Sequence, residues 1–203
     1  HYEKAIADFD KAMTLQGAWF HHARAVAFYF ANRREKALVE VNKSIQINPN
    51  YLKAYITRGV LLRKKGEYEN AISNYAKAIE LDPKFKEAHN ACGYCYRKLG
   101  EYEKAIDEDT KAIQIDPSYK SEYRMRGRSY RLLYRYEDAL ADYNKGIELD
   151  PNCINTYTDR GDCYRWMVKY QNALDDYSKS IQIDSSYKSA YIRRGICYCL
   201  LGN

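Results

Sequence analysis

The chain has 203 residues, with 33 Lys and Arg against 27 Asp and Glu, and a net charge of +6 at pH 7. No stretch approaches the ~18 consecutive apolar residues of a membrane-spanning helix, so we expect no insertion into a membrane. The six cysteines favour reduced thiols in an intracellular protein of the cytoplasm over a secreted disulfide framework.

Small residues and helix breakers recur every 34 residues along the chain. The glycines of this pattern are Gly59, Gly93, Gly127, Gly161 and Gly195, the alanines are Ala37, Ala71, Ala105, Ala139 and Ala173, and the prolines are Pro49, Pro83, Pro117 and Pro151. A fixed period of this length indicates a tandem array. We expect the second helix of a partial unit at 1–17, complete units at 18–51, 52–85, 86–119, 120–153 and 154–187, and the first helix of a partial unit at 188–203.

Each complete unit is predicted to be a hairpin of two helices. In the unit at 52–85, an apolar stretch at 52–65 is interrupted by Gly66, and a second amphipathic stretch follows at 68–81. Gly59 is expected to let the two helices approach closely. Because such a hairpin cannot bury its apolar surface alone, neighbouring hairpins must complete its core.

The unit AYITRGVLLRKKGEYENAISNYAKAIELDP resembles a tetratricopeptide repeat. The positions that carry the resemblance are Tyr55, Gly59, Leu62, Ala71, Tyr75, Ala78 and Pro83. Similar sets recur along the chain with local departures. The resemblance implies an all-α fold, a right-handed α-α superhelix (solenoid) of 34-residue helix-turn-helix repeats with about 12 helices.

The regular pattern is broken near the start of the chain and at both ends. The spacing from Ala5 to Ala37 is 32 residues, so the connection through residues 15–18 is two residues short, and we expect an altered angle between the first hairpins. Both ends stop in the middle of a repeat. We therefore expect this segment to be part of a longer array.

Tyrosine and cysteine are mostly explained by packing. Five columns of the repeat hold most of the 22 tyrosines, which we expect in half-buried seams between helices. The tyrosines outside these columns are Tyr29, Tyr94 and Tyr134. Cys95, Cys163 and Cys197 share a column that is predicted to be a small packing slot. Cys92 and Cys95 have a CxxC spacing on a predicted helix without a second pair or a His cluster, so neither a metal nor another cofactor is expected.

Catalytic motifs are not recognisable in the chain. It has no Gly-rich phosphate loop, no HExxH and no GxSxG motif. The adjacent His21 and His22 point in different directions on a helix and support neither a ligand pair nor a catalytic base. We expect no catalytic residues and no enzyme activity in this segment.

The face of the first helices that neither core uses is expected to line a concave groove. Tetratricopeptide arrays use this surface for extended peptides or partner helices. Its predicted binding residues are Arg63, Arg97, Arg131 and Arg165, which recur every 34 residues, with Arg124, Arg128, Tyr94 and Trp166. The fourth unit is its most basic stretch, and Asp159 and Asp162 are expected to neutralise the far side. The alternative for the recurring arginines is a solvated charge, or a stem lying over neighbouring rings.

A second arginine column is expected to have a structural role. It consists of Arg24, Arg58, Arg126, Arg160 and Arg194, nearer the seam between the helices. We expect these side chains to pair with acids of the second helices.

These features favour a non-catalytic scaffold that binds a peptide or helix of a partner protein, acidic or mixed acidic and aromatic, in a basic groove. A larger assembly is compatible with this function. One alternative is a substrate-targeting or regulatory arm of a larger enzyme. Another is nucleic-acid binding, which the net charge favours, but the pI near 8.8 is low for a dedicated binder and acids interrupt the basic field.

Overall fold

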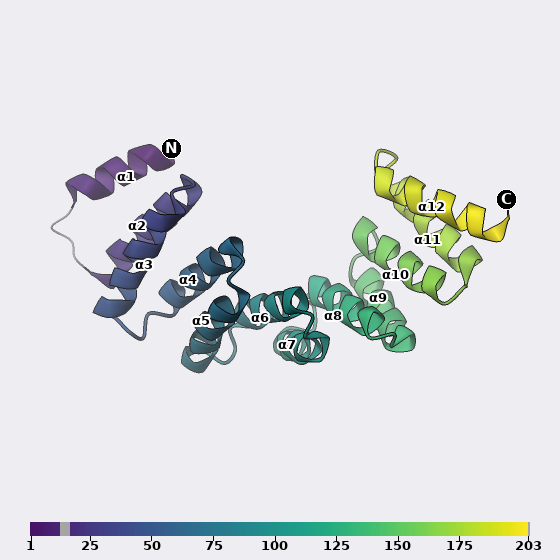
Figure 1. Cartoon of the computed structure of the whole chain (residues 1–203), viewed down its shortest axis with the longest axis horizontal. Helices are drawn as coiled ribbons and strands as arrows, with labels where there is room; N and C mark the ends of the chain where they lie inside the picture. The colour runs from purple at the N-terminus through teal and green to yellow at the C-terminus, as the bar shows by residue number, and fades with distance from the viewer. Residues whose placement is uncertain (13–16, 203) are drawn as a thin grey trace. The chain divides into compact units, whose positions relative to one another are not determined.

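A computed structural model describes residues 1–12 and 17–202, which form twelve α-helices and no strand (Figure 1). The predicted all-α fold is confirmed. The helices are α1 (Tyr2–Lys11), α2 (Ala18–Phe30), α3 (Arg34–Ile47), α4 (Leu52–Lys65), α5 (Tyr68–Leu81), α6 (Lys86–Leu99), α7 (Tyr102–Ile115), α8 (Lys120–Leu132), α9 (Tyr136–Leu149), α10 (Ile154–Trp166), α11 (Tyr170–Ile183) and α12 (Lys188–Leu201).

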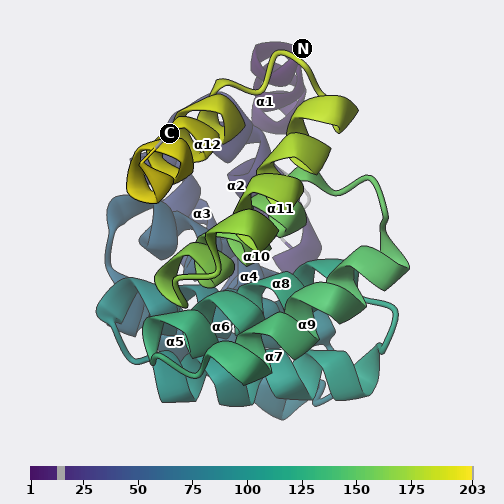
Figure 2. The same ribbon diagram turned by 90° about the vertical axis from the view of Figure 1, so that its right-hand side faces the viewer.

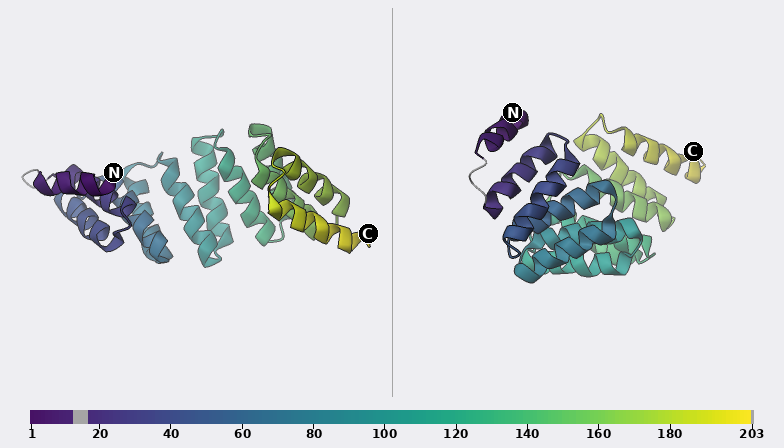
Figure 3. Two further views of the ribbon diagram at one scale, coloured as in Figure 1. Left: turned by 90° about the horizontal axis from the view of Figure 1, so that it is seen from above. Right: turned by 60° about the vertical axis from the view of Figure 1, so that its left-hand side comes forward.

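The chain divides into two compact units, His1–Gly100 and Glu101–Asn203. In the first unit each helix from α1 to α6 contacts the next, as the right-hand panel of Figure 3 shows for the purple to blue helices. In the second unit α7 to α12 also contact one another in chain order, and Figure 2 brings α9, α10 and α11 to the front. Each unit is thus built by the successive packing of helix pairs that is typical of a solenoid.

The turn inside a helix pair follows from local backbone chemistry. Gly66 ends α4 with a left-handed φ of 88°. Its N–H donates to the carbonyl of Arg63 at 3.1 Å, and the N–H of Glu67 donates to the carbonyl of Leu62 at 3.0 Å. This pair of bonds satisfies the last carbonyls of the helix, and glycine adopts the required conformation without a steric penalty.

Glycines of the first helices face buried tyrosines of the second helices. A Cβ atom on Gly59 would lie 2.5 Å from Cε1 of Tyr75, and one on Gly161 would lie 2.7 Å from Cε1 of Tyr177. Both tyrosine rings are completely buried. The prediction that Gly59 allows the two helices of a pair to approach closely is therefore confirmed.

Arg126 and Arg160 of the second arginine column each tie a first helix to two second helices. Arg160 on α10 makes a bidentate bond to Asp176 on α11, at 2.9 and 2.6 Å, and also donates to Asn144 on α9 at 2.6 Å. Arg126 binds Asp142 in the same way, at 2.8 and 2.7 Å. The partners lie 16 residues before and after Arg160 in the sequence. The predicted pairing with acids of the second helices is confirmed at both arginines. It is wrong at Arg58, which donates to the amide oxygens of Asn74 and Asn42, and at Arg194, which donates to the Ser178 hydroxyl.

Arg24, the member of this column on α2, keeps its ion pairs although the repeat spacing is shorter near the start of the chain. Arg24 pairs with Asp10, which lies 14 residues before it, and its guanidinium is 3.6 Å from the Glu40 carboxylate, 16 residues after it. Because the connection is two residues shorter, Arg24 pairs with a residue 14 positions before it, whereas Arg160 pairs with one 16 positions before it. Residues 15 and 16 of that connection lie outside the described residues.

The cysteine column is a packing slot, as predicted. Cys95, Cys163 and Cys197 are completely buried. Burial raises the pKa of the Cys95 and Cys163 thiols to about 11. These thiols are therefore protonated at neutral pH and behave as small apolar side chains.

Candidate functional site

The first helices of successive pairs lie against one another within each unit. α2 contacts α4 in the first unit, and α10 contacts both α8 and α12 in the second. The first-helix surface of the second unit is defined by Ser121, Arg124, Arg128 and Arg131 on α8, Asn155, Thr158, Asp162 and Arg165 on α10, and Ser189, Ile192, Ile196 and Cys199 on α12.

Ion pairs between first helices reduce the basic charge of this surface. Arg124 on α8 donates to Asp159 on α10 at 3.0 Å, and both side chains are largely buried. Arg124 is one of the predicted binding residues. Because its charge is offset by a carboxylate of the protein, it attracts an anion less than its position in the sequence indicates.

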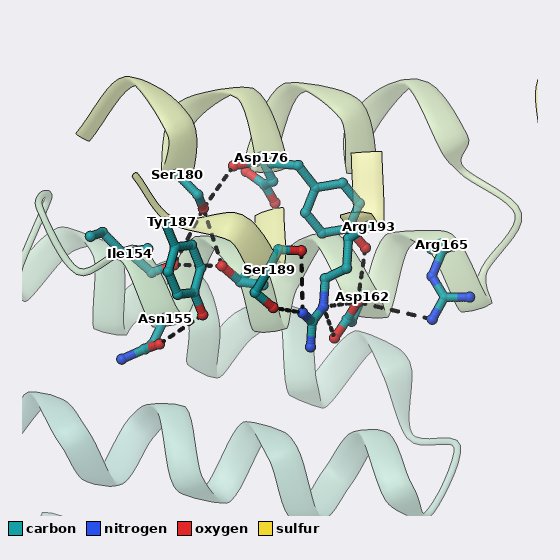
Figure 4. Close-up of polar contacts among 11 residues, drawn as sticks. Ile154, Asn155, Asp162, Arg165, Asp176, Ser180, Tyr187, Ser189 and Arg193 are labelled. Atoms are coloured by element: carbon teal, nitrogen blue, oxygen red, sulfur yellow. Dashed lines mark hydrogen bonds and ion pairs between the residues drawn. The ribbon is translucent and has the colours of Figure 1, made fainter. Parts of the chain in front are cut away.

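Asp162 is the centre of a polar network on the same surface (Figure 4). Its carboxylate accepts a hydrogen bond from the Tyr177 hydroxyl at 2.9 Å and from Nε of Arg193 at 3.1 Å to each oxygen. The Arg165 guanidinium lies 3.9 Å away, and Arg193 also donates to Ser189. Asp162 is only 8% exposed. The expected neutralisation by Asp159 and Asp162 is confirmed, and it occurs through ion pairs inside the protein.

The recurring arginine column lies at the ends of the first helices. Its members Arg63, Arg97, Arg131 and Arg165 stand in the last turns of α4, α6, α8 and α10. The carbonyl end of a helix dipole stabilises a cation in that turn. The Arg63 guanidinium also lies 4.8 Å from the ring centre of Tyr94, and that of Arg165 lies 5.3 Å from the ring centre of Trp166. The helix ends and the rings therefore account for part of this column.

The two predicted aromatic anchors differ in exposure. Tyr94 is half-buried, packs on the core cluster that contains Tyr75, and is approached by Arg63 and Lys98. Trp166 is 56% exposed at the end of α10. Trp166 is thus the more accessible of the two for an incoming ligand.

Arg128 has no structural partner that accounts for its charge. It lies in the middle of α8, half-buried, and makes neither an ion pair nor a side-chain hydrogen bond within residues 1–12 and 17–202. Arg131 also forms no ion pair with any residue of those ranges, and its Nε is buried without a hydrogen-bond partner there. Because Arg124 is paired, the unpaired charge of the fourth repeat comes from Arg128 and Arg131.

Left-handed turn residues are a feature that the sequence interpretation missed. Asn32, Tyr134 and Val168 have φ angles of 59°, 60° and 61°. They follow α2, α8 and α10 at the place that Gly66, Gly100 and Gly202 hold after α4, α6 and α12. The 34-residue spacing aligns Tyr134 and Val168 with these glycines, so the column itself could have revealed them.

A pocket of about 110 Å³ lies beside one of these turns. It is lined by Arg131, Leu132, Tyr134, Tyr136 and Trp166. Two of the predicted binding residues, Arg131 and Trp166, therefore lie together at one site in the second unit.

The described histidines and acidic residues form local hydrogen bonds and no metal site. In the part of the chain that the structure describes, no three His, Cys, Asp or Glu residues are grouped to hold a metal ion. His21 lies 2.8 Å from the Glu40 carboxylate, and His22 lies 2.9 Å from the Thr57 hydroxyl. None of the twelve helices described has the length and apolar character needed to cross a bilayer.

Family profiles match the middle of the chain. One described as a TPR repeat matches residues 59–98, and one described as a tetratricopeptide repeat matches residues 86–119 and 121–153. None of the curated proteins compared with the chain matches it significantly.

Solved structures share the fold at low sequence identity. The C-terminal part of a TPR repeat-containing protein from Cytophaga hutchinsonii has a TM-score of 0.82 and 22% identity, over 95% of this chain and 80% of that one. MamA from Desulfovibrio magneticus RS-1 has a TM-score of 0.79 and 19% identity, over 84% and 96%. YrrB, described as a TPR protein with an unusual peptide-binding site, has a TM-score of 0.77 and 20% identity, over 92% and 97%.

Stacked helix pairs whose first helices share one surface define a helical-repeat scaffold. The profile matches identify residues 59–119 and 121–153, more narrowly, as tetratricopeptide repeats, and solved TPR structures share the fold of the chain. Proteins built from this repeat are generally non-catalytic scaffolds for protein–protein interaction.

Proposed function

We propose that this segment is a non-catalytic scaffold that binds an extended acidic segment of a partner protein on the first-helix surface of the second unit. Arg128 carries the proposal. A half-buried guanidinium without an ion pair has lost part of its hydration and has gained no carboxylate in return. A carboxylate of a ligand supplies that partner through bidentate hydrogen bonds.

Arg131 adds a second unpaired charge one helical turn further along α8. Residues three apart lie on the same side of a helix, so both guanidinium groups can approach one segment of the ligand. Arg124 and Arg165 are already offset by Asp159 and Asp162, and we assign them the role of positioning the ligand through their remaining N–H donors.

The surface also offers apolar contacts, which favours a mixed segment over a purely acidic one. Ile192 and Ile196 on α12 are exposed, and α12 contacts α10, which contacts α8. The acidic part of the ligand is therefore assigned to α8 and an apolar part to α12. In the first unit, Arg63, Arg97 and Tyr94 are proposed to form a further basic and aromatic contact.

The test is selection from a library of random peptides displayed on phage, with this chain as bait. We expect the enriched peptides to carry Asp or Glu. The double variant Arg128→Glu, Arg131→Glu should bind a synthetic copy of an enriched peptide at least about tenfold more weakly, about 1.4 kcal/mol, because repulsion replaces two charge-assisted hydrogen bonds.

The matched control is Lys145→Glu, Lys179→Glu, which makes the same change in net charge on the second helices α9 and α11. This control should bind the peptide about as well as the original chain does. Equal weakening by both double variants would show a general charge effect and refute the site. Enrichment of peptides without acidic residues would refute the acidic ligand.

A further inference from the structure

The turn after α8 has Tyr134 at a position with left-handed backbone conformation, where glycine would suffice. Tyr134 has a φ of 60°. Its N–H donates to the carbonyl of Arg131 at 3.1 Å, and the N–H of Arg135 donates to the carbonyl of Tyr130 at 2.9 Å. The turn at Gly66 closes with the same two bonds, at 3.1 and 3.0 Å. The two turns therefore have the same hydrogen-bond pattern, and the tyrosine side chain is not required for it.

The side chain of Tyr134 contributes little to the core. It is 76% exposed, and its ring meets the Tyr136 ring in an edge-on arrangement, with 6.2 Å between ring centres. A residue with a Cβ is disfavoured relative to glycine in the left-handed region. A residue that costs backbone energy and exposes an aromatic ring points to function.

Tyr134 lines the pocket at this turn, together with Arg131, Leu132, Tyr136 and Trp166. The volume of about 110 Å³ is below that of the ~150 Å³ apolar cavity that holds benzene. It therefore suits one aliphatic side chain. A glycine at this position, as in the glycine turns, would supply no side chain to this lining.

The charges at the pocket favour a particular kind of residue next to the aliphatic side chain of the ligand. Arg131 lines the pocket and forms no ion pair within the described residues, and the Arg165 guanidinium lies over Trp166. Three aromatic rings alone would also suit a methylated cation, but two guanidinium groups repel one. A carboxylate is the complementary neighbour.

We infer that this pocket takes one aliphatic side chain of a partner protein's extended segment, with an adjacent Asp or Glu whose carboxylate binds Arg131. The inference rests on the proposed function and deepens it. The arginines attract acidic segments in general. Among these segments, the pocket binds preferentially those with Leu, Ile or Val next to the acidic residue.

The experiment uses peptides enriched from the random library on this chain. We expect them to share an aliphatic residue next to Asp or Glu. Replacing that residue by Ser in a synthetic peptide should weaken binding to the original chain at least about tenfold. The Tyr134→Gly chain should bind the two peptides about equally. Trp166→Ala, which removes another lining side chain, should act in the same direction.

Two controls separate the pocket from the fold. Tyr134→Gly should not lower the thermal midpoint, because glycine suits the left-handed turn. Val168→Gly makes the same backbone change at a residue with a φ of 61° that does not line the pocket, and it should keep the preference for the aliphatic peptide. A loss of preference in Val168→Gly would overturn the assignment to this pocket.

The outcomes distinguish the two proposals. If the Ser peptide binds the original chain as tightly as its parent, the pocket inference fails and the acidic ligand stands. If Arg128→Glu leaves binding unchanged while Tyr134→Gly abolishes the preference, the first-helix site fails and the pocket stands. If no peptide is enriched, both are overturned.

Discussion

The contact between Gly127 and Tyr143 predicts that Gly127→Ala destabilises the second unit. A Cβ on residue 127 would lie 2.8 Å from Cε1 and 3.1 Å from Cδ1 of Tyr143, and 3.2 Å from the carbonyl oxygen of Ala139. The tyrosine ring is completely buried, and the carbonyl belongs to the backbone of α9. Neither can move away without repacking the helix pair.

The size of the effect follows from two opposing contributions. Forcing an extra methyl group into a packed core costs about 1–3 kcal/mol. Replacing glycine by alanine inside a helix gains up to ~1 kcal/mol. Gly195→Ala on α12 measures the gain in helix propensity without the steric cost, because a Cβ there meets nothing within 4 Å. Gly127→Ala should therefore be about 1–3 kcal/mol less stable than Gly195→Ala, or ~2–12 °C lower in thermal midpoint.

The assay is thermal unfolding of both variants, followed by far-UV circular dichroism. A second comparison places Gly127→Ala in a Tyr143→Leu background. The smaller side chain removes the clash, so the added cost of Gly127→Ala should shrink in a double-mutant cycle. Equal midpoints for Gly127→Ala and Gly195→Ala, or an unchanged cost in the Tyr143→Leu background, would refute the steric explanation.

Two further predictions concern buried ionisable groups. Arg126→Met should cost about 3 kcal/mol near neutral pH, because it leaves the buried carboxylate of Asp142 unpaired. Burial already raises the pKa of Asp142 and Arg126 opposes that rise, so the variant raises the pKa further. A carboxyl group with a raised folded-state pKa loses stability as pH rises through that pKa; the cost should therefore shrink toward about pH 4, as urea unfolding at two pH values will show. Arg135→Met, which breaks an exposed pair, should have little effect at either pH. Iodoacetamide should modify the exposed Cys199 well before Cys163, whose pKa burial raises to about 11, as mass spectrometry of the folded chain will show.

Steric requirements inside one repeat could be predicted from the sequence. Gly59 recurs as Gly127 and Gly161 because a tyrosine ring of the second helix occupies the space of a Cβ in each of these three pairs. The pairing of Arg126 with Asp142 was predictable for the same reason, since both residues belong to one repeat.

Contacts between repeats could not be predicted in the same way. The bonds from Arg124 to Asp159 and from Arg193 to Asp162 join first helices of different repeats. Their geometry depends on how far one pair is shifted and rotated against the next, which the periodicity of a single unit does not contain. The sequence therefore indicated where acids would offset the basic surface, but not which arginines they would neutralise.

The recurring arginines show why periodicity alone is weak evidence for a binding site. A solenoid repeats each structural need once per unit, so a residue that recurs, such as Arg63, is explained as readily by the helix end and the ring beside it as by a ligand. A residue that breaks its column has no such explanation. Arg128 stands where other repeats have Val60, Tyr94 or Asp162, and Tyr134 stands where three of them have Gly66, Gly100 or Gly202. Since the common fold requires neither side chain, the selectivity of this array is best sought at these two departures.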